Sequence, residues 1–461
     1  MSTRVLSALH HAVEVDLVTR LEGLGAAVTV VRRCPDLADL LAAAAASVGD
    51  VALVSASLRG LDREAVARLH DEGVALVGVS ATEADERVLH QLGADRVVTH
   101  DAEAAALGTA VADAAALAVE GYGGPGLRGL EGAVRTGGEP RRHTSGSSVV
   151  GLPTGAYAAD PGPPELLDPS APRPPAPIVA VWGPVGAPGR TTVAVNLAAE
   201  LAATGIEVLL VDADTWGASI AQALALVDEA PGLVAATRAS DQGRLDRVGL
   251  ARLAPSVVAN LRVLTGMPRP DRWPEVRQAA LEHVLDLSRS IVDVVVVDCG
   301  FCLEDDEELS YDTLAPRRNL ATLTSLARAT TVLAVGAADP VGLQRLVRGV
   351  QDLGVVQAPT PRVVVNKLRE SAVGKRPDRQ IRGALTRFAG LADLVFLPWD
   401  PAACDAGILT GEPLRVSAPR SALREAVREL AMTLASDLGV DRAVARRAGI
   451  LAPTGPGSRG R

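Results

Sequence analysis

The segment from Trp182 to Thr192, W-G-P-V-G-A-P-G-R-T-T, constrains this chain more than any other. It follows the apolar run Ile178–Val181, which is typical of a buried strand, and precedes Thr191–Thr204, which has the composition of a helix. A strand, a glycine-rich loop and a helix in this order place backbone N–H groups and a helix N-terminus around a phosphate. The segment therefore predicts an α/β domain that binds a phosphate-bearing ligand.

The loop departs in three places from the pattern Gly-x-x-x-x-Gly-Lys-[Ser/Thr] that usually binds phosphate. Arg190 stands where the lysine is expected, Pro184 stands where the first glycine is expected, and Pro188 has no N–H to donate. Arginine keeps the positive charge, but its planar guanidinium is longer than an ammonium group and differently shaped. The loop therefore indicates phosphate binding and weakens the expectation of efficient chemistry.

Composition limits the classes of protein to which the chain can belong. At 461 residues it is long enough for two or three domains, and 48% hydrophobic with 22% charged residues is ordinary for a globular protein. The net charge of −9 disfavours nucleic acid as a partner, although a local basic patch is compatible with it. Four cysteines do not make a disulfide framework, and we find no signal peptide and no apolar stretch of membrane-spanning length. We therefore expect a cytoplasmic protein.

Residues 1–122 alternate short β-type runs with Ala- and Leu-rich helical runs. Helices are expected between the strands, for example at Ala12–Leu24, Asp36–Ala46 and Arg63–Glu72. Alternation of this kind is typical of a small doubly wound α/β domain with a parallel sheet. The expected strands are Arg4–Leu9, Ala27–Arg32, Asp50–Ala56, Ala75–Ser80 and Arg96–Thr99.

The chain changes character twice after this domain. Residues 123–176 are dominated by Gly, Pro, Ser and Arg without apolar periodicity, which predicts a flexible, disordered linker. Residues 177–438 return to strand–helix alternation, and residues 439–461 form an Arg- and Gly-rich tail that we expect to fray. The strands expected in 177–438 are Ile178–Trp182, Val208–Asp212, Leu261–Leu264, Val292–Asp298, Thr331–Val335, Arg362–Val365 and Leu394–Leu397.

Three of these seven strands end in polar side chains. Asp212 ends the expected strand Val208–Asp212, and Asp214 lies two residues further on. Asp298 ends the strand Val292–Asp298, and Asn366 directly follows the strand Arg362–Val365. Open parallel sheets bind ligands at the carboxyl ends of their strands. Taken singly, the aspartates could simply cap the next element, and Asn366 could be an ordinary strand-end amide. Their shared order after a phosphate-type loop favours a nucleotide site.

In this order the motifs resemble those of the MinD/ParA family of P-loop ATPases, whose loop is Lys-Gly-Gly-x-Gly-Lys-Thr-Thr. The resemblance covers residues 177–435 and includes Leu397–Pro401, Ala406–Gly407 and Gly411–Leu414, which resemble the family's "Pro-x-Asp … Ala … Gly-x-Pro" stretch. It implies a P-loop NTPase domain with a doubly wound, mostly parallel sheet. Residues 1–122, which resemble a response-regulator receiver as described below, narrow the resemblance to the CpaE/TadZ branch of this family.

The resemblance implies roles for particular residues. The hydroxyl of Thr191 would bind Mg²⁺, and Asp298 would hold the same ion through water. Asp214, with Asp212 beside it, would orient the attacking water, and Arg190 would act in the place of the catalytic lysine. The residues that would bind ATP are Gly186, Gly189, Arg190, Thr191 and Thr192 at the phosphates, and Asn366 and Pro398 at the adenine.

Two departures from the family pattern bear on activity. Val185 stands where the family has a second lysine that reaches the partner subunit's nucleotide, so that contact is missing. Arg190 could reflect only a general preference for arginine, because Lys367 and Lys375 are the only lysines of the chain. The survival of Lys367, and the fact that Val185 is not arginine, argue against that explanation. We therefore expect ATP binding with slow or absent hydrolysis.

The resemblance implies a regulatory protein that positions a cellular machine. Members of the branch position pilus-assembly or polar machinery, so the machine we expect is a Tad/Flp pilus or secretion apparatus. We expect a homodimer across the nucleotide, located in the cytoplasm or peripherally at the membrane or cell pole, with protein cargo on the N-terminal domain. The alternatives are a nucleotide-independent scaffold with a degenerate site and an ATPase of chromosome or plasmid partitioning or of septum-site placement.

The N-terminal domain resembles a response-regulator receiver in the order and spacing of its strands. A receiver carries an acidic pair after the first strand, where this chain has Leu9, His10 and His11. It also carries an aspartate at the end of the third strand, where Ser55 stands, and a lysine after the fifth, where Thr99 stands. We therefore expect a docking or dimerising module rather than a phospho-acceptor.

Two further segments allow more than one interpretation. Cys299 and Cys302 form a C-x-x-C directly after the strand that ends at Asp298. We interpret them as small buried residues, with a redox or metal role in a metabolic enzyme as the alternative. Ser421–Leu438 has apolar residues at helical spacing, which predicts a closing helix of the domain, with an amphipathic membrane-targeting helix as the alternative.

Overall fold

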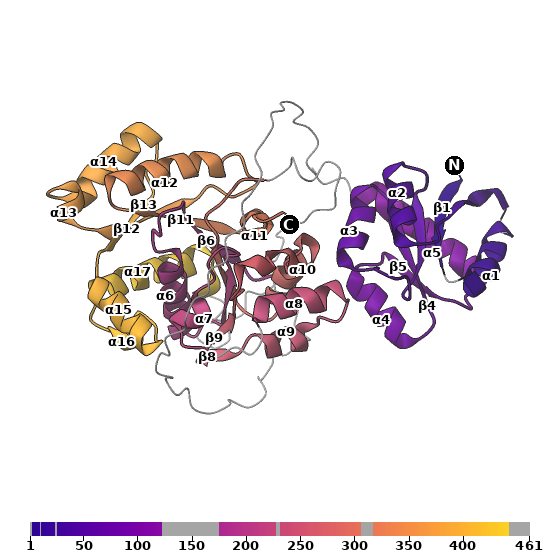
Figure 1. Cartoon of the computed structure of the whole chain (residues 1–461), viewed down its shortest axis with the longest axis horizontal. Helices are drawn as coiled ribbons and strands as arrows, with labels where there is room; N and C mark the ends of the chain where they lie inside the picture. The colour runs from indigo at the N-terminus through magenta and orange to yellow at the C-terminus, as the bar shows by residue number, and fades with distance from the viewer. Residues whose placement is uncertain are drawn as a thin grey trace, which may run out of the picture. The chain divides into compact units, whose positions relative to one another are not determined.

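The computed structural model describes residues 2–9, 11–23, 25–121, 175–226, 231–305 and 317–441. The chain divides into two compact units, Met1–Ala158 and Ala159–Arg461 (Figure 1). Almost all of the predicted linker at 123–176 and most of the predicted tail at 439–461 lie outside the described residues. Each unit is an α/β fold, as the alternation of strands and helices predicts.

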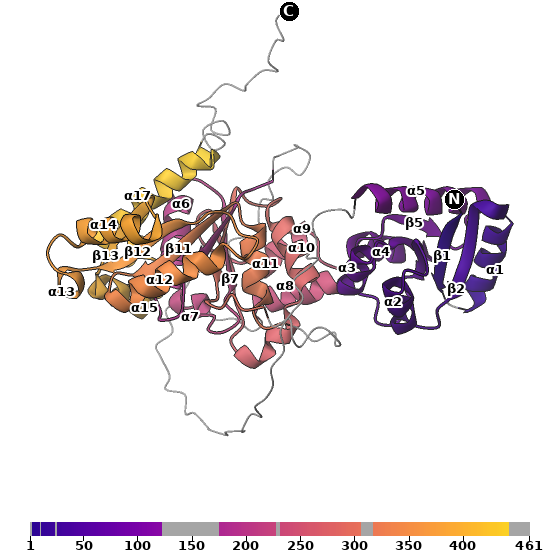
Figure 2. The same ribbon diagram turned by 90° about the horizontal axis from the view of Figure 1, so that it is seen from above.

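The described part of the N-terminal unit contains a parallel sheet with the strand order β2-β1-β3-β4-β5. This is the order of the flavodoxin-like doubly wound folds. The helices α1 and α5 cover one face of the sheet, and α2 to α4 cover the other (Figure 2). Leu17 and Leu107 belong to the apolar cluster on the first face, and Leu40, Leu69 and Leu92 belong to the cluster on the second. The elements are β1 (Thr3–Ala8), α1 (His11–Glu22), β2 (Val28–Arg33), α2 (Leu37–Ala45), β3 (Val51–Ser55), α3 (Arg63–Asp71), β4 (Ala75–Ser80), α4 (Glu83–Leu92), β5 (Arg96–Thr99) and α5 (Ala104–Gly121).

The C-terminal unit is built on a larger sheet whose described strands have the order β13-β12-β11-β6-β10-β7-β9-β8. All neighbouring pairs are parallel except β8 and β9, so the antiparallel pair lies at one edge. The central strands are runs of valine and isoleucine buried on both faces, as expected where helices cover both sides of a parallel sheet. The strands are β6 (Ile178–Trp182), β7 (Val208–Ala213), β8 (Ser256–Val258), β9 (Leu261–Leu264), β10 (Val294–Cys299), β11 (Thr331–Ala337), β12 (Arg362–Leu368) and β13 (Leu394–Pro398).

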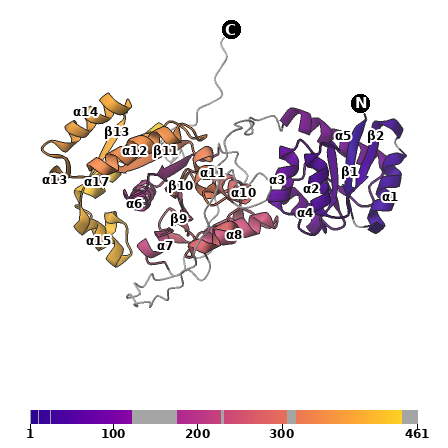
Figure 3. The same ribbon diagram turned by 45° about the horizontal axis from the view of Figure 1, so that its top comes forward.

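Helices cover both faces of this sheet (Figure 3). On one face Leu281 of α10 and Leu346 of α12 belong to the same apolar cluster, and on the other Leu197 of α6 and Leu430 of α17 do so. The helices are α6 (Arg190–Ala203), α7 (Ile220–Ala223), α8 (Gly232–Asp241), α9 (Arg247–Leu253), α10 (Gln278–Ser288), α11 (Leu320–Arg328), α12 (Pro340–Leu353), α13 (Glu370–Val373), α14 (Pro377–Ala389), α15 (Pro401–Thr410), α16 (Leu414–Ser417) and α17 (Ala422–Asp437).

The strands predicted from the sequence are all present, and β12 continues beyond the predicted end to Leu368. The prediction missed β8, whose three residues are too few to show a period. The predicted helix at Ser421–Leu438 is α17, whose apolar side, with Val427 and Leu434, packs into the domain as a closing helix does. No helix among the described residues is long and apolar enough to cross a bilayer.

A buried ion pair joins the helix that follows the glycine-rich loop to the closing helix. Arg424 of α17 donates from Nε and Nη2 to the two carboxylate oxygens of Glu200 on α6, at 2.7 and 3.0 Å. The Glu200 side chain is only 3% exposed. The pair therefore fixes α6 against α17 in a geometry that matches the arginine fork to the carboxylate.

We expect Arg424→Ala to lower the free energy of unfolding of the C-terminal unit by about 3 kcal/mol, because it leaves the Glu200 carboxylate buried without its partner. Chemical denaturation followed by tryptophan fluorescence reports this unit alone, since all four tryptophans of the chain lie within it. The matched control is Arg428→Ala, which removes an exposed ion pair with Glu425 on the same helix and should cost much less, because water screens this pair. Equal losses for the two variants would contradict this account.

Candidate phosphate-binding site

The loop between β6 and α6 exposes the start of a helix to a ligand. Gly189, the residue before α6, adopts a left-handed conformation with φ of 101°, and no described side chain caps the helix. The N–H groups of the first turn, among them those of Thr191 and Thr192, are therefore available to an anion, at the positive end of the helix dipole. This is the environment that the sequence predicts for Gly189, Thr191 and Thr192.

Two glycines of the loop are required by close neighbours as well as by their backbone angles. A Cβ atom at Gly189 would lie 2.4 Å from Nδ2 of Asn366, and one at Gly186, where φ is 115°, would lie 2.4 Å from Nη1 of Arg345. Side chains from β12 and α12 therefore press directly against the loop. A larger residue at either position would push these side chains away from it.

Three side chains from this direction donate to carbonyl groups of the loop. Asn366 Nδ2 donates to the Pro188 carbonyl at 2.9 Å, and Lys367 Nζ donates to the Ala187 carbonyl at 2.8 Å. Arg345 Nη1 donates to the Val185 carbonyl at 3.3 Å. The sequence predicted a role for Asn366 because it stands at the end of a strand. The position of Lys367 directly after Asn366 could have indicated a role for the lysine as well. Nothing in the sequence marks Arg345.

Arg190 lies folded back across the base of the loop. Its Nη1 donates to the carbonyls of Gly183 and Pro184 at 3.1 and 3.3 Å, and its Nη2 forms an ion pair with Asp214 Oδ2 at 3.3 Å. Its Nε is buried and has no hydrogen-bond partner among the described residues. The guanidinium thus joins the loop to the end of β7, which is a contact that the sequence pattern does not reveal.

Two carboxylates are buried side by side at the carboxyl edge of the sheet. Asp298 at the end of β10 pairs in register with Asp212 at the end of β7, and both are about 1% exposed. Thr191, in the first turn of α6, donates its hydroxyl to Asp298 Oδ2 at 2.6 Å. The structure therefore brings the predicted metal-binding residues, Thr191 and Asp298, into direct contact.

The two neighbouring carboxyl groups favour their protonated forms. Burial raises the pKa of Asp212 to about 7, and the negative charge of Asp214 adds to the rise. Burial also raises the pKa of Asp298 well above its usual range, and the charge of Asp212 is the second cause. A cation bound at this edge would stabilise the ionised carboxylates and so lower both pKa values.

The residues present fit a magnesium ion. Asp298 Oδ1 is buried and accepts no hydrogen bond from the described residues, so one carboxylate oxygen is left over beside the Thr191 hydroxyl. Ser219 adds a second hydroxyl, whose Oγ lies 3.4 Å from Thr191 Oγ1. Carboxylate, hydroxyl and phosphate oxygens are the ligands that Mg²⁺ prefers.

Asp212 and Asp214 also hold the turn that follows β7. Asp214 Oδ1 accepts from the N–H groups of Trp216 and Gly217 at 2.8 and 3.1 Å. Asp212 Oδ2 accepts from the N–H groups of Ser219 and Ile220, each at 3.0 Å. The capping alternative therefore describes part of what these residues do. The second oxygen of Asp214, Oδ2, accepts from Arg190, and this contact links the turn after β7 to the loop.

The residues predicted at the adenine lie on the β12 side of the loop. Pro398 ends β13 opposite Leu368 of β12, two residues beyond Asn366. Asn366 uses both ends of its amide locally, since Nδ2 donates to Pro188 and Oδ1 accepts from the Lys367 N–H at 2.8 Å. Adenine recognition by Asn366 would require this amide to leave the loop.

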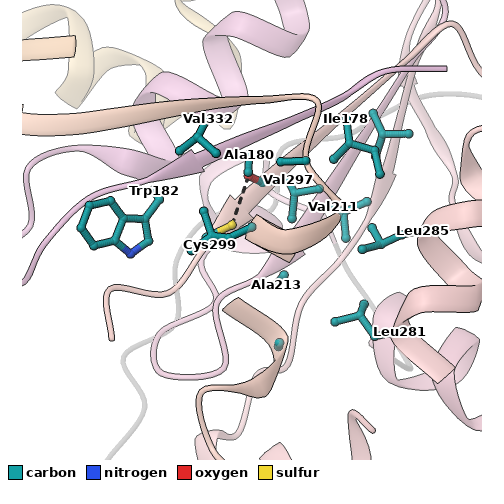
Figure 4. Packing of buried hydrophobic residues seen from close by; sticks show 14 of the residues in the cluster. Ile178, Ala180, Trp182, Val211, Ala213, Leu281, Leu285, Val297, Cys299 and Val332 are labelled. Carbon is teal, nitrogen blue, oxygen red and sulfur yellow. Dashed lines mark hydrogen bonds between the residues drawn. The ribbon is translucent and has the colours of Figure 1, made fainter. Parts of the chain in front are cut away.

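The two cysteines of the C-x-x-C have different surroundings. Cys299 is fully buried among Ala180, Val297 and Val332, and its Sγ lies 3.8 Å from the Val297 carbonyl (Figure 4). Burial raises the pKa of its thiol well above the usual range. Cys302 is only partly buried, so the prediction of buried packing residues holds for Cys299 and is wrong for Cys302. Within the described part of the chain no group of three or more His, Cys, Asp or Glu side chains is placed to hold a metal ion.

The fold and this site together define a protein with a nucleotide-type phosphate loop on a doubly wound sheet. A model of the CobQ/CobB/MinD/ParA nucleotide binding domain matches residues 179–410, which is half of the chain. The chain belongs to this family.

The chain is also similar to particular proteins. It is 27% identical over 254 residues to an iron-sulfur cluster carrier protein of Mycobacterium tuberculosis, which is 53% of this chain and 61% of that relative. It resembles the structure of a ParA family ATPase from Chlorobium tepidum, at 17% identity and a TM-score of 0.47, over 56% of this chain and 98% of that one. It also resembles MinD of Pyrococcus horikoshii in complex with Mg-ADP, at 18% identity and a TM-score of 0.45, over 58% of this chain and 98% of that one.

The raised pKa of Asp212 predicts how stability changes with pH. The folded unit binds a proton at Asp212 that the unfolded chain releases near pH 4, so the free energy of unfolding should fall as pH rises from about 4 to about 7. One such group contributes at most about 1.4 kcal/mol per pH unit. Asp212→Asn should remove this contribution, so the free energy of unfolding of the variant should rise relative to that of the wild type as pH rises. Denaturation in the presence of EDTA measures both values.

The control for the pH experiment is Asp246→Asn, which alters an exposed carboxylate that caps α9. The dependence of its stability difference on pH serves as the reference. If the difference for Asp212→Asn does not rise more steeply with pH than the difference for Asp246→Asn, the buried carboxyl group is not the cause.

Proposed function

We propose that the C-terminal unit binds ATP with Mg²⁺ and works as a regulatory switch that positions a cellular machine, with slow or absent hydrolysis. The observation that carries the proposal is the contact between Thr191 and Asp298 at 2.6 Å, directly at the N-terminus of α6. A hydroxyl on the first turn of a helix next to a buried strand-end acid is the arrangement that holds Mg²⁺ beside a phosphate. The unpartnered Oδ1 of Asp298 supports the same assignment.

Each part of the site has a task in nucleotide binding. The N–H groups from Gly189 to Thr192 and the charge of Arg190 would hold the phosphates. Mg²⁺ bound by Thr191 and, through water, by Asp298 would neutralise charge on the phosphates. Asp214 and Asp212 would hold the attacking water, and Gly186 would let the loop pass close to the nucleotide. Asn366 and Pro398 would meet the adenine.

Three features support slow hydrolysis. The Arg190 guanidinium is already engaged with the carbonyls of Gly183 and Pro184 and with Asp214, so its charge is held at the base of the loop. Pro188 has no N–H to donate. Val185 is 52% exposed and apolar at the position from which the family's second lysine reaches a partner. All three weaken stabilisation of the transferring phosphoryl group more than binding.

The turn after Asp214 is the segment whose conformation would change with the nucleotide. Trp216 in this turn stacks under the Arg318 guanidinium at 3.6 Å, contacts the Phe301 ring at 5.3 Å and donates from Nε1 to Asn319 at 3.0 Å. A nucleotide that draws Arg190 or Asp214 out of their ion pair would therefore act on the segments after β10 and before α11 through Trp216.

The order of the two units is the basis for a finer proposal. A receiver-like domain in front of this type of ATPase supports assignment to the CpaE/TadZ branch and to a Tad/Flp pilus or secretion apparatus as the machine. The N-terminal domain would bind the protein cargo, and two copies would pair across the nucleotide, in the cytoplasm or at the membrane or cell pole. Partitioning and septum-site placement use the same switch with a different cargo.

One observation favours a second candidate, a scaffold that needs no nucleotide. Arg190 and Asp214 satisfy each other's charge inside the site, so Arg190 does not need a phosphate to balance its charge. Iron–sulfur cluster carriage, the role in the name of the mycobacterial relatives, is not included in the proposal, because the sulfur of Cys299 lies inside the apolar core.

Calorimetry on the full chain distinguishes the switch from the scaffold. We expect ATP to bind in the presence of Mg²⁺, and Asp298→Ala to weaken this binding at least tenfold, because the site loses its carboxylate partner for the ion. In EDTA the variant and the wild type should differ much less. An absence of heat with both ATP and ADP would rule out the switch and leave the scaffold.

We expect Arg190→Lys to raise the rate of ATP hydrolysis about tenfold, because a compact ammonium group that does not fork between the loop carbonyls and Asp214 can follow the transferring phosphoryl group. Phosphate release at saturating ATP measures the rate. Arg428→Lys, which alters the exposed ion pair with Glu425 on α17, should leave it unchanged. A rate that stays level or falls in Arg190→Lys would show that arginine does not limit the chemistry.

A further inference from the structure

A pocket of about 530 Å³ opens in the N-terminal unit at the carboxyl ends of β1, β2 and β3. In the strand order β2-β1-β3-β4-β5, the chain connections change direction between β1 and β3, and the pocket lies at this point. Open α/β sheets bind their ligands at such a switch point, outside the carboxyl ends of the strands. The volume is within the range of small-molecule sites.

The pocket contains two arginines with uncommitted charges. Arg33 at the end of β2 and Arg59 after β3 line it, and both are exposed to solvent. Neither forms an ion pair or a side-chain hydrogen bond with another described residue. The neighbouring Arg32 differs, because it donates to both carboxylate oxygens of Asp39. Two guanidinium groups at one pocket without carboxylate partners are suited to a phosphate, which can accept from both.

Two hydroxyl groups complete the polar lining. Ser55 ends β3, and its Oγ lies 2.8 Å from the Oγ of Ser57 and accepts from the Ser57 N–H at 3.3 Å. Both residues line the pocket. A receiver has an aspartate at the position of Ser55. The corresponding place in this domain therefore has a hydroxyl group instead of a carboxylate, and the two guanidinium groups lie at the same pocket.

The two carboxylates in the lining already have partners. Glu14 accepts the hydroxyl of the fully buried Ser7 at 2.7 Å, and Asp36 caps α2 by accepting from the Asp39 N–H at 2.9 Å. Cys34 also lines the pocket, and burial followed by the charge of Asp39 raises the pKa of its thiol to about 12, so it adds no negative charge. The lining therefore carries two positive and two negative formal charges, and the carboxylates are engaged with Ser7 and with the start of α2, while the two guanidinium groups have no partner among the described residues.

We propose that this pocket binds a small molecule that carries a phosphate group, with Arg33 and Arg59 on the phosphate and the Ser55 and Ser57 hydroxyls on its polar body. Ala8, Leu9 and Leu58 supply the apolar part of the lining. The N-terminal domain would then be a ligand sensor in addition to a docking module. This site is separate from the loop at residues 183–192, and the proposal does not depend on nucleotide binding there.

Hydrogen–deuterium exchange on the full chain tests the site and locates it at the same time. The probe is ribose 5-phosphate, with ribose as its uncharged counterpart. We expect ribose 5-phosphate to slow exchange in peptides covering residues 33–39 and 55–59, and ribose to have no effect. A titration followed in these peptides gives the affinity, which should fall at least tenfold in the double variant Arg33→Gln/Arg59→Gln.

Two further variants make the outcome unambiguous. Arg32→Gln removes an adjacent positive charge that is already paired and should leave the protection intact, whereas Ser55→Ala should weaken it without altering exchange in β1 and β4. The proposal is overturned if the wild type shows no protection in these peptides, if ribose protects equally, or if Arg32→Gln loses as much affinity as the double variant. Protection confined to residues 183–192 would also overturn it, and would instead support the phosphate loop.

Discussion

The packing of Asp212 against Asp298 is the interaction on which the site of the C-terminal unit depends. The strands β7 and β10 are neighbours in register, so their strand-end carboxylates cannot avoid each other, and burial removes the water that would separate their charges. The fold meets this cost with local donors: the N–H groups of the turn after β7, the Thr191 hydroxyl and the Arg190 guanidinium. The donors from the loop, from the first turn of α6 and from the turn after β7 therefore converge on these carboxylates.

Arg190 resolves the charge balance in a way that lysine would not. A guanidinium has enough donors to join two loop carbonyls and the Asp214 carboxylate at once, and the result is a loop that is tied to the turn after β7. On the other side Asn366, Lys367 and Arg345 tie the same loop to β12 and α12. Phosphate binding must therefore compete with contacts that the protein makes with itself, which connects occupancy of the loop with the positions of its neighbours.

The fold could be predicted from the sequence because its signals are local. Runs of valine alternating with Ala- and Leu-rich helices identify the strands, and polar residues such as Asp298 and Asn366 at strand ends identify the edge of the sheet that carries the site. The contacts of Arg345 with Val185 could not be predicted, since the two lie 160 residues apart and only the β6–β11 pairing brings α12 beside the loop. The pocket around Arg33 and Arg59 was missed because the comparison with a receiver considered Leu9 and Ser55 only for the acidic residues that they replace, and nothing in the sequence marks the two arginines.

Lys367 is one of only two lysines in 461 residues, and its amino group sits on the loop, donating to the Ala187 carbonyl. Amine-directed chemistry, whether acetylation in a cell or labelling with an activated ester, therefore has almost no other side chain to choose from. Acylation of Lys367 would remove its charge and enlarge it beside the loop. In this protein a reaction that is usually spread over many surface lysines would be concentrated beside the glycine-rich loop between β6 and α6.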